Sequence, residues 1–257
     1  MIIDTHCHLY DDCFKDDLND IVSQFSINNI KNAFIVGTDL ESSKQAIEMA
    51  EKFDLYAIIG LYPEYADQFD SNFENFLTKN ANNKRVVAIG EIGLDYHNKG
   101  YNKQQQIEVF EKQIKIAHKT GLPLCIHVRD AFGDILAVLE KNKQYLTNGG
   151  VIHCFSGSTE VAKQFIKLGF KLGFGGVCTF KNAKKTVECL QNIDVKDILI
   201  ETDAPYLSPE PFRGKRNEPK HTNYVLAKIA EIKNIDIKKL EKAIEQNTID
   251  IFKKYVG

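Results

Sequence analysis

Residues 86–127 read VVAIGEIGLDYHNKGYNKQQQIEVFEKQIKIAHKTGLPLCIH, and the organisation of the chain is clearest in this segment. The apolar run Val86–Gly90 is followed by helical spacing over Lys103–Thr120 and then by a second apolar run, Pro123–His127. The helix ends at Gly121, and the proline that follows cannot continue it. The segment therefore predicts strand, helix and strand, which is the repeating unit of a parallel sheet.

The same alternation extends along the whole chain. Amphipathic segments such as Leu40–Phe53 and Thr159–Leu168 separate short apolar runs, and His221–Val256 reads as two closing helices. Each run is almost continuously hydrophobic, as parallel strands buried on both faces are. The predicted strands are Ile2–His6, Asn32–Gly37, Leu55–Gly60, Val86–Gly90, Pro123–His127, Gly150–Cys154, Phe170–Gly175 and Asp197–Thr202.

Eight strand and helix alternations predict an α/β fold, the (β/α)8 TIM barrel, as one domain over residues 1–257. A barrel of this kind takes about 250 residues. The alternative is an open, doubly wound sheet. No proline- or serine-rich linker or short-period repeat divides the chain.

Composition narrows the functional classes. Hydrophobic residues make up 43% of the chain and charged residues 26%, with a net charge of −2. This charge excludes a strongly basic, DNA-coating protein, so nucleic acid would have to bind at a local basic site. The six cysteines include no CxxC pair, no run approaches a membrane span, and only three residues precede Asp4. We expect a cytoplasmic protein without a membrane segment, a monomer by default with no obligate protein partner.

Histidines and carboxylates occupy the carboxyl ends of the predicted strands. His6 and His8 are two residues apart, so they point to the same side where the first strand ends. One histidine alone is more often a satisfied core group than a ligand, but two at this spacing favour a metal site. The other strand ends carry Glu91, His127, His153 and Asp203.

The carboxyl ends of barrel strands are the face where barrel enzymes place their chemistry. Six ligands are too many for one tetrahedral ion and suit two divalent ions that share a carboxylate. Imidazole favours zinc, manganese or iron over magnesium, although magnesium stays open because cellular availability also decides.

Six motifs in this chain resemble, in order, those of the TatD family of metal-dependent deoxyribonucleases, in the amidohydrolase-like superfamily. They extend from residue 4 to residue 219. The motifs are Asp4–Leu9, Gly90–Tyr96, Ile126–Ala131, His153–Gly157, Glu201–Leu207 and Arg213–Pro219.

The resemblance implies a TIM barrel that hydrolyses phosphodiesters in DNA, trimming the 3′ ends of single strands with divalent metal. It also implies how the ligands divide. His6, His8, Glu91 and Asp203 would hold one ion, and Glu91, His127 and His153 the other, with Glu91 bridging. We expect Asp203, as ligand and general base, to orient the attacking water and accept its proton.

One position departs from the family pattern. Members often have a histidine before the proline that follows the third strand, whereas this chain reads Gly60-Leu61-Tyr62-Pro63. The unperturbed pKa of tyrosine is about 10, so Tyr62 cannot replace an imidazole as an acid or base near pH 7. It can still donate a hydrogen bond or stack on a base, and we count it as a substrate contact.

Basic side chains near the predicted catalytic face suggest a phosphate clamp. Arg213, Lys215 and Arg216 bring three cations into four residues just after the Asp203 strand. Most such runs are solvated loops, but this position and the planar fork of arginine favour phosphate. Arg129, two residues after His127, is another candidate, with an internal salt bridge as its alternative.

Two other functions are compatible with these residues. A small-molecule hydrolase of the same superfamily, acting on an amide, a lactone or a phosphoester, would use the same ligands, although an uncharged substrate would not need the basic loop. A non-catalytic nucleic-acid-binding relative is suggested only by Tyr62.

Overall fold

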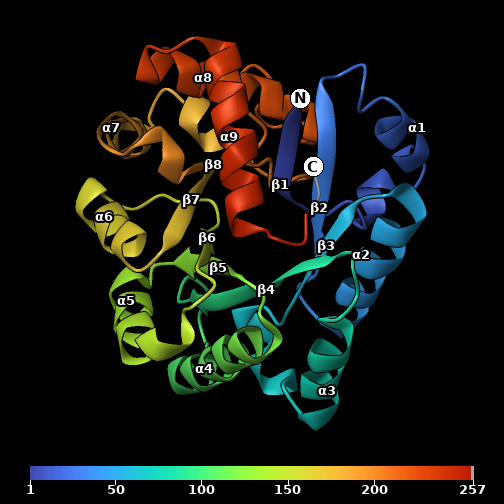
Figure 1. The fold of residues 1–257 in the computed structure, drawn as a ribbon, viewed down its shortest axis with the longest axis vertical. Coiled ribbons are helices and arrows are strands. Elements are labelled where there is room, and N and C mark those ends of the chain that lie inside the picture. The colour runs from blue at the N-terminus through green and yellow to red at the C-terminus, as the bar shows by residue number, and fades with distance from the viewer. Residues whose placement is uncertain (256–257) are drawn as a thin grey trace.

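The computed structural model describes residues 1–255, and its eight strands form one parallel sheet in chain order (Figure 1). Every neighbouring pair is parallel, so each connection must cross over through a helix or loop. The strands are β1 (Ile2–Cys7), β2 (Ile30–Val36), β3 (Tyr56–Ile59), β4 (Val86–Asp95), β5 (Leu124–Arg129), β6 (Gly150–Ile152), β7 (Phe170–Phe174) and β8 (Ile198–Ile200).

Helices surround the strands (Figure 1). Their ends follow the expected chemistry: Asp39 caps the second helix by accepting from Ser42 N at 2.7 Å, and Gly121 ends the fourth in a left-handed conformation. The helices are α1 (Leu18–Ser23), α2 (Leu40–Phe53), α3 (Ser71–Asn80), α4 (Lys103–Thr120), α5 (Phe132–Lys141), α6 (Thr159–Lys167), α7 (Lys184–Asn192), α8 (Thr222–Lys233) and α9 (Ile237–Ile251).

The sheet closes where the first and last strands meet. Cys7 and Ala204 form a parallel bridge just beyond the end of β8. Backbone bonds from His8 N to Ala204 O (2.7 Å) and from Asp203 N to His6 O (2.9 Å) continue this pairing. The barrel prediction is confirmed, and the open doubly wound sheet is wrong, because its outer strands would not meet.

Strand β4 differs most from its prediction. It continues to Asp95 instead of ending at Gly90, so Glu91 lies within the strand, at a register shift against β5. A Cβ on Gly90 would lie 2.5 Å from the Cys125 side chain, and one on Gly93 would lie 2.1 Å from His127 O. Two glycines therefore permit a bulge that an apolar run does not reveal.

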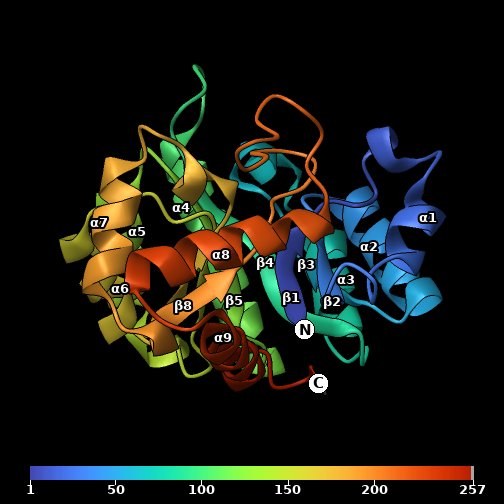
Figure 2. The same ribbon diagram turned by 90° about the horizontal axis from the view of Figure 1, so that it is seen from above.

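The two ends of the barrel are built differently. The N-terminus and helix α9 lie on the lower face in Figure 2, and the loop after β8 lies on the upper face. Aromatic side chains seal the lower end: Phe34 packs edge-to-face on Tyr56, Phe252 and Tyr255, with ring centroids 4.9–5.8 Å apart. The upper end carries the polar groups described next.

Candidate metal centre

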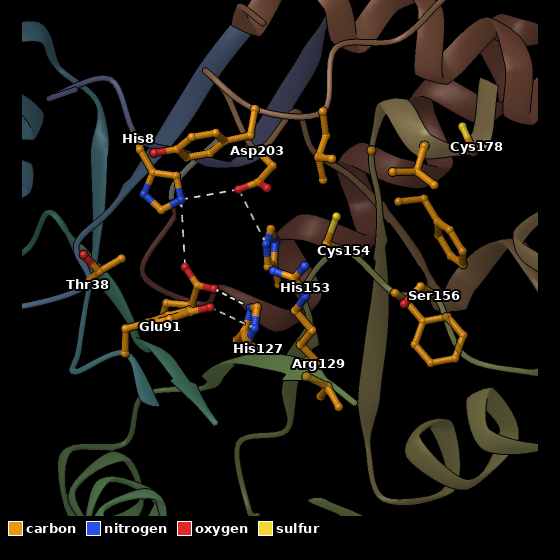
Figure 3. Close-up of a pocket in the computed structure, with 18 of the residues that line it drawn as sticks. His8, Thr38, Glu91, His127, Arg129, His153, Cys154, Ser156, Cys178 and Asp203 are labelled. Carbon is orange, nitrogen blue, oxygen red and sulfur yellow. Dashed lines mark hydrogen bonds and ion pairs between the residues drawn. The ribbon is translucent and has the colours of Figure 1, made fainter. Parts of the chain in front are cut away.

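Six predicted ligands converge at the carboxyl ends of the strands. β1 and the residue after it supply His6 and His8, while β4 and β5 supply Glu91 and His127. His153 follows β6 directly and Asp203 is the third residue after β8, and both strands are shorter than predicted. Figure 3 shows the side chains of His8, Glu91, His127, His153 and Asp203 pointing toward one another.

The ligand atoms form two groups. In the first, Asp203 Oδ1 lies 3.3 Å from His8 Nε2 and 3.8 Å from His6 Nε2, and the two imidazole nitrogens are 3.3 Å apart. In the second, His127 Nδ1 lies 2.9 Å from Glu91 Oε1, and His153 completes the cluster. Each group brings three metal-capable atoms within 4.8 Å of one another.

Glu91 contributes to both groups through different oxygens. Oε1 faces His127, while Oε2 lies 3.4 Å from His6 Nε2 and 3.8 Å from His8 Nε2. A carboxylate placed in this way can bridge two cations. The ligand division that the family motifs imply, with Glu91 shared by two ions, stays a prediction.

Outward partners fix which imidazole nitrogens face the cluster. His8 Nδ1 donates to Val36 O at 2.8 Å, and His127 Nε2 donates to Asp95 Oδ2 at 3.0 Å. Because a carbonyl and a carboxylate can only accept, the inward nitrogen of either ring carries a lone pair once the ring has lost its second proton. Lone pairs aimed at a shared point are what a cation requires, so this donor set fits divalent metal.

Glu201 is the outward partner of the His153 ring. Its Oε1 lies 3.0 Å from His153 Nδ1 and accepts from Cys154 N at 2.5 Å. The contact with His153 is electrostatic, because its direction does not satisfy hydrogen-bond geometry although its distance does. Glu201 is fully buried, and a Cβ at position 173 would lie 2.4 Å from its Oε2, so Gly173 makes room for the carboxylate.

Asp95 and Glu201 were not predicted as site residues. Both belong to quoted motifs, Asp95 four residues after Glu91 and Glu201 two before Asp203, and that proximity was the available signal. Their partners on neighbouring strands become evident only once the barrel is assembled.

Neighbouring histidines favour the ionised form of both carboxylates in the cluster. Burial alone would raise the pKa of Glu91, but hydrogen bonds from His127 and His6 outweigh burial and hold that pKa well below its usual value. Burial likewise opposes ionisation of Asp203, yet His153 and His8 lower its pKa. Both carboxylates are therefore ionised near neutral pH.

The pKa of His153 is raised, in contrast to those of Glu91 and Asp203. Burial alone would lower its pKa, but Glu201, Asp203 and Glu91 outweigh that effect and raise it to about 10. Without metal, His153 therefore holds a proton at pH 7. A divalent ion that binds its Nε2 has to displace that proton.

A cavity of about 650 Å³ opens above the cluster. Two predicted substrate contacts, Tyr62 and Arg129, line it together with His8, Glu91 and Asp203. Among residues 1–255, no carboxylate pairs with the Arg129 guanidinium within 4.0 Å, so the salt-bridge alternative has no partner there. Arg129 stays a predicted phosphate contact.

The basic loop lies outside the cavity lining. Arg216 forms ion pairs with Asp17 at 2.5 Å and with Glu218 at 3.0 Å, and its guanidinium packs over Phe14. These partners hold the Arg216 guanidinium beside α1, and Arg216 stays a predicted phosphate contact. Arg213 and Lys215 are exposed, with Arg213 over the ring of Phe180.

Comparison with known proteins decides the family. A family model described as TatD related DNase matches residues 3–253. The chain belongs to the TatD family. A Bacillus subtilis relative named uncharacterized metal-dependent hydrolase YabD is 40% identical over 98% of this chain and 99% of its own length. By the same comparisons, the chain is a metal-dependent hydrolase.

Two further TatD relatives have a named activity or a solved structure. A Citrobacter koseri protein named 3'-5' ssDNA/RNA exonuclease TatD is 33% identical over 93% of this chain and 94% of its own length. The solved structure of the Escherichia coli TatD homologue YJJV superposes with a TM-score of 0.92 at 29% identity, covering 98% of both chains. In this TatD protein, every helix of residues 1–255 is too short or too polar to span a bilayer.

Proposed function

We propose that this protein is a divalent-metal-dependent phosphodiester hydrolase that removes nucleotides from the 3′ ends of single-stranded DNA. The observation that carries the proposal is the position of Glu91 at an open cavity, with Oε1 facing His127 and Oε2 facing His6 and His8. The relative named as a 3'-5' ssDNA/RNA exonuclease, similar over 93% of this chain, supports the substrate class.

The cavity suits the end of a strand. It is large enough for a nucleotide-sized ligand, and Arg129 adds a positive charge with no carboxylate partner within 4.0 Å among residues 1–255. The chain's net charge of −2 provides no general attraction for polyanions, so binding depends on such local groups. This combination favours short, flexible ends over long duplexes.

The residues of the chain divide the chemistry between them. Divalent ions bound at the two groups supply positive charge beside the scissile phosphate and lower the pKa of water there. Asp203 is held through Oδ1, 3.3 Å from His8 Nε2 and 3.6 Å from His153 Nε2, so its other oxygen accepts the proton of the attacking water. Water adds to phosphorus, the bond to the 3′ oxygen breaks, and that oxygen leaves with the proton that Asp203 had accepted. Arg129 binds a nonbridging phosphate oxygen throughout.

The test is cleavage of a single-stranded oligonucleotide labelled at its 5′ end, with Mg²⁺, Mn²⁺ or Zn²⁺ added. The proposal expects a ladder that shortens one nucleotide at a time, requires metal and disappears in Glu91→Gln. The matched control is Glu48→Gln, an exposed glutamate on α2, which should behave as wild type. A 3′ label should be released at once if the polarity is as proposed.

Two results would overturn the proposal. Hydrolysis of lactones, amides or phosphotriesters by a protein that leaves every oligonucleotide intact would establish the small-molecule hydrolase instead. Stoichiometric metal binding without turnover of any of these substrates would identify a non-catalytic relative.

A further inference from the structure

The hydroxyl of Tyr62 is fixed on the side of the cavity next to His127. It donates to Asp95 Oδ2 at 2.8 Å and lies 3.1 Å from His127 Nε2. Asp95 Oδ2 also accepts from His127 Nε2, so one carboxylate oxygen receives both protons. The phenol group therefore has its partner within the protein and is not available to a substrate.

The backbone around Tyr62 is held equally firmly. Tyr62 N donates to Thr38 O at 2.8 Å, and Gln113 bonds both backbone groups of Leu61, at 2.8 and 3.1 Å. The next residue is Pro63, whose ring fixes its own φ. With both ends of the residue fixed, the aromatic ring has little freedom to lose when it binds something.

The ring itself faces the cavity. Tyr62 is half-buried and lines the cavity beside Tyr65, with ring centroids 6.3 Å apart and planes inclined by 57°. Its ring centroid is only 4.8 Å from that of His127, in the second ligand group. A base joined through its sugar to a phosphate at that group lies next to this wall.

We propose that Tyr62 is a rigid stacking platform for the nucleobase of the nucleotide being removed, and that Tyr65 extends the platform at the rim. The inference rests on the proposed nuclease function and adds a requirement to it: the terminal nucleotide must carry a base. Every base has an aromatic face, so the platform tolerates all four bases and rejects an end that has none.

The test compares two single-stranded oligonucleotides, one with a normal 3′ nucleotide and one whose 3′ sugar lacks its base. Both are cleaved by wild type and by Tyr62→Leu. Loss of one base stack corresponds to about five- to hundredfold in kcat/KM. Tyr62→Leu should lose about this much on the normal end, mainly through KM, beyond the loss of kcat that it shares with Tyr62→Phe and shows on the abasic end.

The ratio of the two substrates separates stacking from damage to the metal centre. A disturbed His127 would slow both substrates equally, whereas a lost platform slows only the one with a base. Tyr62→Phe keeps the ring, so it should retain the preference for the normal end even if kcat falls. Tyr224→Leu, an exposed tyrosine outside the cavity lining, serves as the matched control.

Equal losses on both substrates in Tyr62→Leu would overturn the platform while leaving the nuclease function intact. Absence of cleavage of either substrate by metal-loaded wild type would overturn the nuclease function itself, and the platform with it. The two failures are therefore distinguishable.

Discussion

The upper and lower ends of this barrel enclose buried side chains of opposite character. The lower end is closed by Phe34, Tyr56, Phe252 and Tyr255, which pack ring against ring and provide apolar burial. The upper end buries histidines and carboxylates whose charges are incompletely balanced without metal. The contrast teaches that stability and chemistry are separated along the barrel axis. Substitutions at one end should therefore leave the property of the other end largely unchanged.

The largest expected effect is a loss of stability caused by a substitution at the lower end. Phe252 is fully buried, and Phe252→Ala should reduce the free energy of unfolding by about 3–5 kcal/mol because it leaves a cavity in the aromatic cluster. Urea unfolding measures this loss. At a temperature where the variant stays folded, its kcat/KM should match wild type, and a large fall in kcat/KM would show that the two ends are coupled.

The next effect concerns the upper end alone. Glu201→Gln keeps an oxygen near His153 Nδ1 but removes the charge that orients the ring. Metal affinity should fall about 10- to 100-fold, as for other partners of metal-binding histidines. Competition with a chelating dye measures it, and the unfolding midpoint of the metal-free protein serves as the stability readout. An unchanged metal affinity would show that Glu201 does not support His153 as a metal ligand.

Proton competition gives a smaller, graded effect. The pKa of His153 is raised to about 10 in the metal-free protein, so the ring is protonated at pH 7 and metal must expel a proton. Apparent metal affinity should therefore rise with pH, by about tenfold per unit or more between pH 6 and 8. Calorimetry in buffers with different ionisation enthalpies would detect the released proton. A pH-independent affinity would contradict this protonation state.

The smallest expected effect concerns the contribution of the loop after β8 to substrate binding. Arg213 and Lys215 are exposed and lie outside the cavity lining, so they can reach only nucleotides beyond the terminal one. Replacing both with alanine should change kcat/KM on a dinucleotide by less than about twofold. On a longer strand, the slope of log affinity against log salt concentration should become shallower by about one unit per charge removed. A large loss on the dinucleotide would place these side chains at the reacting phosphate.

Hydrophobic pattern alone predicted much of this architecture. The runs of β-branched and aliphatic residues located all eight strands, and Gly121 with Pro123 predicted the end of α4. Position at strand ends brought His6, His8, Glu91, His127, His153 and Asp203 into one prediction. These features depend on local sequence, which is why they could be read before the chain was folded.

Features that depend on distant partners could not be read in this way. The β4 bulge exists because Gly90 and Gly93 lie against β5, and no apolar pattern records such an approach. The ion pair of Arg216 with Asp17, 199 residues earlier in the chain, likewise has no signal in the local sequence. Asp95 and Glu201 are recognisable as partners of histidines only when neighbouring strands are assembled.

The central claim is that the six side chains at the upper end form a two-ion hydrolytic centre. The most direct measurement is a titration of chelator-stripped protein with Mn²⁺ or Zn²⁺, following bound metal and oligonucleotide cleavage together in wild type and Glu91→Gln. We predict that cleavage is absent at first, reaches its plateau at two bound ions per chain, and stays at least about a thousandfold lower in the variant. Full cleavage by the stripped protein, or full activity in Glu91→Gln, would contradict it.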